Sequence, residues 1–151
     1  MMLSFYESLL NRLEALHGDM TRCIAGLAPE ALDWTPGEGM NSLTALVMHI
    51  TQVERHLVGG RVGQDSTGRD AEAEFGASGL DEAVLQQHMD DSLAHMRRIF
   101  EQLTLEDLRD QRKSPATGKF QTVGWLLCHT LDHTAEHLGQ MAITRQLWDR
   151  R

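Results

Sequence analysis

The sequence predicts an all-α protein built as a four-helix bundle, and three observations support this. Four long segments place apolar residues at three- and four-residue steps, which is the spacing of one face of an α-helix. Only 3 prolines and few runs of β-branched residues leave little material for strands. A length of 151 residues suits a single domain, residues 1–151, that buries a sizeable core. Four amphipathic helices bury their apolar faces most simply against one another.

The first helix is expected to begin with a capping box, in which Ser4 is the N-cap and Glu7 reaches back to it. Gly26 and Pro29 end this helix, and a turn with a Pro/Gly-rich loop follows at residues 29–40. The residues predicted to form its buried stripe are Phe5, Leu9, Leu13, Leu16, Met20, Ile24 and Leu27.

The second helix is expected to start at Asn41 or Ser42, because both residue types are good N-caps. It is predicted to stop at Gly59-Gly60, since glycine commonly ends helices. The polar, glycine-rich residues 61–79 then form a connection that is long for a compact domain. A connection of this length between the second and third helices indicates a crossover or a loop that covers a site.

The second half of the chain predicts two more helices, at residues 81–103 and 122–149. The fourth helix is apolar around most of its circumference, so we expect it to be the most buried. Between the two, Thr104 and Asp107 have the spacing of a second capping box that opens a single turn. Residues 109–121 are predicted to be a loop.

Composition and charge exclude several classes of protein. A net charge of −8 argues against nucleic-acid binding, which needs a clustered basic face. Glu7, Arg12 and Glu14 interrupt the N-terminal apolar pattern, so it is not a signal peptide, and no apolar run is long enough to span a membrane. Cys23 and Cys128 form no metal-binding spacing and fit a reducing compartment. We therefore expect a cytoplasmic protein without a membrane partner.

Histidines provide the strongest functional signal. His129, His133 and His137 follow one another at four-residue steps, so adjacent members can converge on one ion from one helix face. Two imidazoles hold a metal weakly, so a third ligand is expected from the second helix. His49, with apolar neighbours one turn away on either side, is the best candidate, and His56 is the competitor. If the helices run antiparallel, His49 meets the His133/His137 pair, while His56 and His129 line the pocket beside it.

Other residues near this stripe have less certain roles. Asp132 and Glu136 border it and would orient the N–H groups of the ligands or hold a proton, or else would simply be solvated. His17, His88 and His95 are expected at the surface or as fillers of helix faces. The rim of the cavity is expected to comprise Trp34, Asn41 and residues 61–79.

These residues resemble the DinB-like (DinB/YfiT) family of metalloenzymes. The matching stretches are DWTPGEGMNSLTALVMHITQVERH, TVGWLLCHTLDHTAEHLGQM and AITRQLWD. The first contains the family's second-helix histidine at His49. The second contains its H-x-x-x-H-x-G-Q element at His133, His137, Gly139 and Gln140. The resemblance implies a four-helix bundle whose metal ligands are His49, His133 and His137.

The resemblance also implies a reaction type. Members of the family include metal-dependent transferases of low-molecular-weight thiols, so we expect a divalent transition metal, zinc or nickel first, a small-molecule substrate and a homodimer. Three neutral imidazoles would leave a fourth position open, where a thiol or a water molecule would be the reacting group. The alternative is a metal-binding or metal-free bundle that binds a small ligand or dimerises without catalysis.

Overall fold

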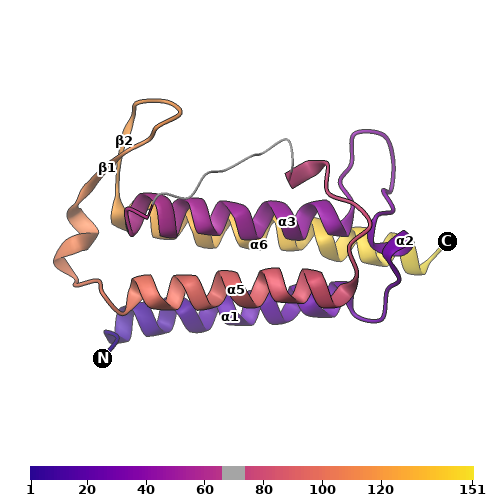
Figure 1. The fold of residues 1–151 in the computed structure, drawn as a ribbon, viewed down its shortest axis with the longest axis horizontal. Coiled ribbons are helices and arrows are strands. Elements are labelled where there is room, and N and C mark those ends of the chain that lie inside the picture. The colour runs from indigo at the N-terminus through magenta and orange to yellow at the C-terminus, as the bar shows by residue number, and fades with distance from the viewer. Residues whose placement is uncertain (66–73) are drawn as a thin grey trace.

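The computed structural model describes residues 1–65 and 74–151, and the chain is mostly helical (Figure 1). The elements in chain order are α1 (Ser4–Ile24), α2 (Pro29–Leu32), α3 (Leu43–Glu54), the π-helix η1 (Arg55–Val62), α5 (Glu82–Phe100), the 3₁₀ turn η2 (Glu106–Arg109), β1 (Gln111–Lys113), β2 (Phe120–Thr122) and α6 (Val123–Asp149). Within this described part, no helix is both long enough and apolar enough to cross a membrane.

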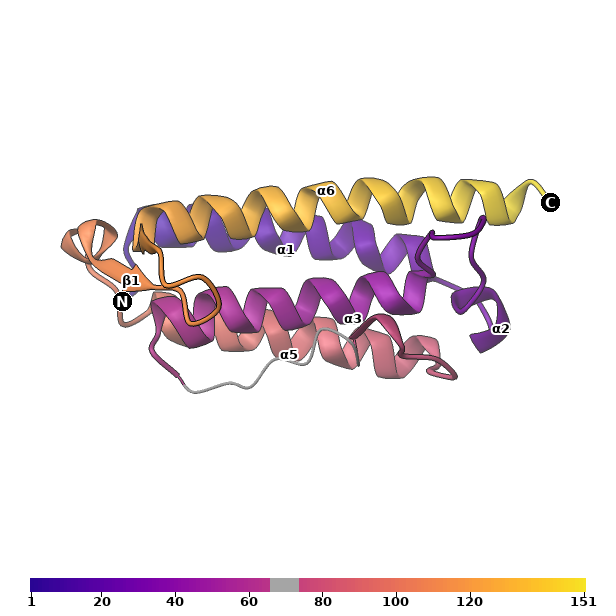
Figure 2. The same ribbon diagram turned by 90° about the horizontal axis from the view of Figure 1, so that it is seen from above.

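The long helices α1, α3, α5 and α6 lie side by side (Figures 1 and 2). α3 runs antiparallel to α6, as the placement of His49 opposite the C-terminal histidines required. α3 and α5 are neighbours that run in the same direction. The expected crossover at residues 61–79 falls partly on residues 66–73, which lie outside the described residues.

α1 differs from prediction at its first turn. The N-cap is Leu3, no side chain caps the helix, and Ser4 is already its first residue, so the predicted capping box is wrong. The first turn also presents a different face to the core than the predicted stripe. Tyr6 is fully buried and donates its hydroxyl proton to the carbonyl of Thr104 at 2.6 Å. Phe5 consequently faces solvent. The members of the predicted stripe that the structure buries are Leu13, Leu16, Met20 and Ile24.

The second predicted helix does not stop at Gly59-Gly60. It continues through η1 to Val62. A Cβ on Gly59 would lie 2.4 Å from Cε1 of His95, and one on Gly63 would lie 2.5 Å from Cδ1 of Ile99. These two glycines therefore permit a close approach to α5, and the first of them does not act as a helix stop.

Most of the predicted helix starts are confirmed by their capping hydrogen bonds. The side chains of Ser42, Asp81 and Thr122 each accept a backbone N–H at the start of α3, α5 and α6 respectively. The second capping box is also present, because the Thr104 N–H donates to Asp107 at 2.6 Å and the Asp107 N–H donates to the Thr104 hydroxyl at 3.4 Å.

The predicted loop at residues 109–121 contains a short hairpin, so the expectation of a chain without strands is wrong here. β1 and β2 pair antiparallel, with Arg112 opposite Gln121. Gly118 adopts a φ of 70° in the tight connection between the strands, a conformation that glycine reaches without strain. With three residues in each strand, the pattern is too short to show alternation in the sequence.

The expectation that the last helix is the most buried is wrong as well. α6 buries 7 of its 27 residues, whereas α3 buries 10 of its 12. α6 turns one apolar side to solvent, where Trp125, Ile143 and Leu147 are exposed. α3 packs closely against both α5 and α6 and so has little free surface.

The buried apolar residues form two clusters, one toward each end of the helices. The first includes Tyr6, Leu57 and Phe100, and the second includes Ile24, Leu43 and Met89. Buried polar side chains fill the level between them, and the candidate site lies at that level.

Candidate metal centre

A buried polar layer joins the four long helices. It consists of His17 from α1, Glu54 from α3, Ser92 from α5 and Thr134 from α6. Nε2 of His17 lies 2.9 and 3.0 Å from the two carboxylate oxygens of Glu54. The hydroxyls of Ser92 and Thr134 donate to the same carboxylate at 2.6 and 2.8 Å. We define these four residues as the polar layer.

The polar layer contains an ion pair. Burial on its own would raise the pKa of Glu54, but the charge of His17 and the three hydrogen bonds together lower it. Burial opposes protonation of His17, yet the Glu54 carboxylate raises its pKa above the ordinary value. His17, expected at the surface, is thus buried and paired with a carboxylate. His95, also expected there, is buried against Gly59 and lies 3.3 Å from Asp65.

The candidate metal centre lies beside this layer, where α3 faces α6. His49, His133 and His137 each place one ring nitrogen so that all three nitrogens lie within 4.8 Å of one another. Nε2 of His49 is 3.0 Å from Nε2 of His133. The ring centroids are 4.4 to 4.9 Å apart. The structure therefore brings together the three histidines that the sequence selected.

Two of the three imidazoles are oriented by a partner on the ring nitrogen that faces away from the cluster. Glu74, which is 3% exposed, accepts the Nδ1–H of His49 at 3.0 Å. The side-chain oxygen of Gln140 accepts the Nδ1–H of His137 at 2.9 Å. These bonds leave Nε2 of both rings as the nitrogens that carry a lone pair toward the cluster. Phe75 stacks on His49 with a centroid distance of 4.5 Å and covers its outer side.

His133 is the most electrostatically perturbed member of the cluster. Burial, followed by the neighbouring imidazoles of His137, His49 and His129, lowers the pKa of His133 to about 3. It is therefore neutral at physiological pH and keeps a lone pair for a metal. Its Nδ1 is buried and has no hydrogen-bond partner among residues 1–65 and 74–151.

The two alternative histidines do not join the cluster. His129 stacks on Trp125 at 4.8 Å, and its ring centroid lies 6.1 Å from that of His133. His56 lines a separate pocket beside the β1–β2 hairpin. Neither belongs to the group of described residues close enough to share one ion.

The acidic residue at the site is not one that the sequence indicated. Asp132 and Glu136 are exposed on α6. Glu74 supplies the carboxylate instead, from the segment that was predicted as a covering loop. Glu74 belongs to no periodic pattern in the sequence. Its one sequence signal is an acidic residue next to an aromatic residue, and this pair is too common to identify a functional site.

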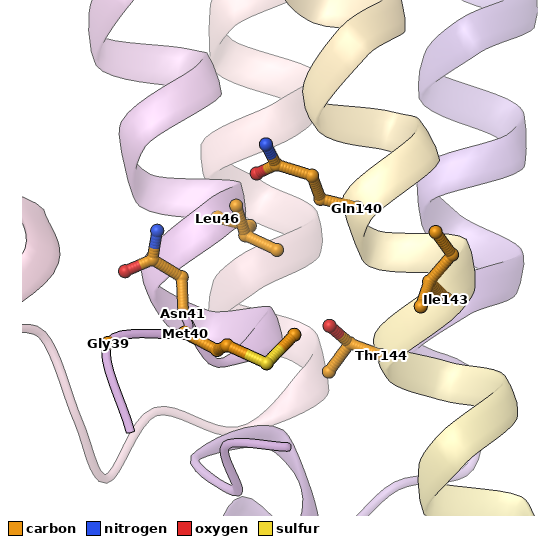
Figure 3. Close-up of a pocket in the computed structure, with 7 residues that line it drawn as sticks. All are labelled: Gly39, Met40, Asn41, Leu46, Gln140, Ile143 and Thr144. Atoms are coloured by element: carbon orange, nitrogen blue, oxygen red, sulfur yellow. The ribbon is translucent and has the colours of Figure 1, made fainter. Parts of the chain in front are cut away.

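A cavity of about 240 Å³ adjoins the cluster between the start of α3 and α6 (Figure 3). Gln140 connects the two, because its side chain lines the cavity and also bonds to His137. Asn41 lies on the cavity wall, as expected for the rim. Trp34 packs against Trp148 instead, with ring centroids 5.7 Å apart. The remaining lining residues are Gly39, Met40, Leu46, Ile143 and Thr144.

Fold and site together define a mostly helical protein whose three clustered histidines can hold a metal ion. Residues 8–150 match the family model described as mycothiol-S-transferase. The chain belongs to this family, and the resemblance to DinB-like proteins is confirmed.

Solved structures show the same fold. A conserved protein from Enterococcus faecalis is 16% identical with a TM-score of 0.81, over 100% of this chain and 99% of that one. A DinB-like protein from Bacillus cereus ATCC 10987 is 16% identical with a TM-score of 0.75, over 93% and 90%. A DinB-like protein from Bacillus subtilis is 20% identical with a TM-score of 0.65, over 92% and 90%. No curated protein sequence matches significantly.

Proposed function

We propose that the protein is a metal-dependent transferase that uses a low-molecular-weight thiol, with His49, His133 and His137 as the metal ligands. The observation that carries this proposal is the convergence of three imidazole nitrogens within 4.8 Å, next to a cavity that Gln140 connects to the cluster. Membership of the mycothiol-S-transferase family supports a thiol as one substrate. Zinc and nickel are the metals that best suit three imidazoles.

The residues present fit a metal of this kind. Two ligands on a tetrahedral ion with bonds of about 2.0 Å lie about 3.3 Å apart, close to the 3.0 Å between Nε2 of His49 and Nε2 of His133. Without a cation, one of these nitrogens has to carry a proton and donate it to the other. Glu74 behind His49 matches the carboxylate–histidine arrangement that commonly supports metal ligands.

A divalent metal bound at the three imidazoles supplies a Lewis acid that lowers the pKa of a thiol. Glu74 and Gln140 keep the rings of His49 and His137 in the tautomer that presents Nε2. Phe75 shields the outer side of His49. These residues hold the ligand set rigid, so little reorganisation is needed when substrates bind.

The adjoining cavity suits the electrophilic partner of the thiol. Its wall is largely apolar, and the side chains of Met40 and Thr144 point toward one another, with Leu46 on α3 beside them (Figure 3). None of its lining residues is charged. A small, uncharged electrophile would therefore bind there by burying apolar surface, with Gln140 placing its polar end near the cluster.

The remaining features of the proposal concern architecture and assembly. We infer one domain of the four-helix-bundle type with a crossover between α3 and α5, in a cytoplasmic protein that does not bind nucleic acid. An apolar groove of about 290 Å³ on α1 and α6, lined by Phe5, Leu9, Leu127 and Leu131, supports a homodimer. Size-exclusion chromatography with light scattering would measure the molar mass of this assembly.

The first test is the metal content of protein purified without a metal-affinity tag, measured by mass spectrometry. We expect about one transition-metal ion per chain, and its loss from the His133→Ala/His137→Ala variant. His88→Ala, which changes a histidine on α5 outside the cluster, should retain the metal. Metal-loaded protein should then accelerate the reaction of a thiol with an electrophile.

Two results separate the proposal from its alternative. Absence of metal after incubation with zinc and with nickel would contradict the proposed centre. The second result is a bound metal that stabilises the fold without coordinating added thiol and without supporting any thiol-dependent reaction. That result would favour a ligand-binding bundle without catalysis. Cobalt(II) substitution offers a direct readout, because its visible spectrum changes when a thiol coordinates.

A further inference from the structure

A second pocket lies at the other end of the second long helix, between η1 and the β1–β2 hairpin. Its volume is about 510 Å³, about twice that of the cavity beside the histidine cluster. The charged residues that line it are Arg61, Arg112 and Lys113, with Asp65 as the acidic member. Three cations around one pocket stand out in a chain whose net charge is −8.

Arg61 is held rigidly in the wall of this pocket. It is 8% exposed, and its Nη1 donates to the side-chain oxygen of Gln121 at 2.6 Å. Its Nη2 donates to the carbonyl of Arg112 at 3.0 Å. Both partners belong to the β1–β2 hairpin, so the hairpin fixes the plane of the guanidinium.

Among the described residues, no carboxylate balances the charge of Arg61. Its Nε–H is also buried without an acceptor in that part of the chain. Burial lowers the pKa of Arg61, which reflects the same desolvation. A buried charge without a counter-ion is unfavourable, so an anion in the pocket would stabilise the Arg61 guanidinium.

Among the described residues, the other charged groups of the pocket leave it positive. Asp65 is directed to His95, from which its carboxylate lies 3.3 Å. Arg112 pairs with Asp110 through both Nη atoms, at 3.4 and 3.5 Å, and its Nε is also buried without a partner among the described residues. Lys113 is exposed at the mouth of the pocket. The field inside the pocket therefore attracts anions.

We propose that this pocket binds the oxyanion group of a small molecule, a carboxylate or a phosphate. Arginine pairs with planar oxyanions through several N–H groups, and a fixed guanidinium loses little entropy on doing so. Arg61 would supply the buried contact, Arg112 a second guanidinium, and Lys113 a point charge at the entrance. The proposal is independent of the metal centre, because none of its residues belongs to the histidine cluster.

The test uses inorganic phosphate and succinate as probes, at constant ionic strength, on the full chain carrying His133→Ala and His137→Ala. That background removes binding to any metal at the cluster. Calorimetry measures Kd, and the NMR signal of the Arg61 Nε–H reports the site directly. We expect at least one probe to bind with millimolar Kd or tighter and to shift this signal. Whichever probe binds identifies the oxyanion.

Variants of the hairpin provide matched controls. Arg61→Gln should weaken binding about tenfold or more, since it removes the buried charged donor. Lys113→Gln should weaken it about two- to fivefold, whereas Lys119→Gln, on the same hairpin but outside the pocket, should leave it unchanged. If Arg61→Gln fails to fold, the comparison of Lys113→Gln with Lys119→Gln tests the proposal.

Two outcomes would overturn the proposal. One is that neither probe shifts the Arg61 signal at concentrations up to about 50 mM. Any Kd would then exceed the range expected for a specific site. The other is that Lys113→Gln and Lys119→Gln weaken binding equally, because this would indicate general attraction to the hairpin and not a pocket.

Discussion

Replacing Glu54 tests the physical account of the polar layer. Its carboxylate is fully buried and accepts hydrogen bonds from His17, Ser92 and Thr134 on three other helices. In Glu54→Gln an amide NH₂ replaces one of the acceptor oxygens, so at least one donor loses its partner and His17 loses its counter-ion. Breaking a buried ion pair costs about 3–5 kcal/mol. Because glutamine retains the shape and one acceptor, we expect a loss near the lower limit, about 3 kcal/mol.

Urea unfolding of the metal-free protein at neutral pH measures this loss. With a slope of about 2 kcal/mol per molar urea, a loss of about 3 kcal/mol lowers the midpoint by about 1.5 M. Glu136→Gln, at an exposed position of α6, serves as the control and should change stability by less than about 0.5 kcal/mol.

One result would refute this reasoning. If Glu54→Gln lowers the urea midpoint by less than about 0.25 M, the ion pair contributes no more than a surface pair does. The charge on His17 and the hydrogen bonds of the polar layer would then not be what holds the four helices at this level.

Three further predictions follow from the site and its surroundings. Glu74→Gln should weaken metal binding about 10- to 100-fold in competition with a chelator, and an unchanged affinity would contradict its supporting role. Because the pKa of His133 falls from an ordinary 6.5 to about 3 on folding, the unfolded state binds more protons. The free energy of unfolding of metal-free protein should therefore decrease as the pH falls from 6.5 toward 3, and His133→Ala should flatten this decrease. Gly59→Ala should destabilise the protein by about 1–3 kcal/mol through its clash with His95, lowering Tm. Gly139→Ala, with no atom within 4 Å of the new Cβ, should raise Tm slightly, and equal effects of both would exclude the steric explanation.

The ligand set could be predicted because its signal is local. His133 and His137 are four residues apart on one helix, and this spacing alone places their side chains on the same face. His49 could be added because its neighbours one turn away are apolar, which indicated a buried position. Side-chain geometry that depends only on helix periodicity can be predicted from a single sequence.

Glu54 and His17 could not be paired in the same way. They are 37 residues apart and meet only because α1 and α3 bury them at the same level. A better reading of α1 was nevertheless present in the sequence. The residues at strict four- and three-residue steps that the structure buries are Tyr6, Leu10, Leu13, His17, Met20 and Ile24. His17 is polar, so a series of apolar residues does not include it, although a buried partner can satisfy its ring nitrogen.

The polar layer also explains how ligands from only two helices are held in position. His49 lies five residues before Glu54 on α3, and His133 directly precedes Thr134 on α6. The hydrogen bond from Thr134 to Glu54, at 2.8 Å, therefore fixes the axial register of α3 against α6 next to the ligands. A slip by one residue would move one helix along the other by about 1.5 Å and rotate its side chains by about 100°. The same slip would break that hydrogen bond and separate His49 from His133. The hydrogen bond from Thr134 to the buried Glu54 carboxylate thus stabilises the alignment on which the metal centre depends. Apolar packing tolerates small shifts and would fix this alignment less well.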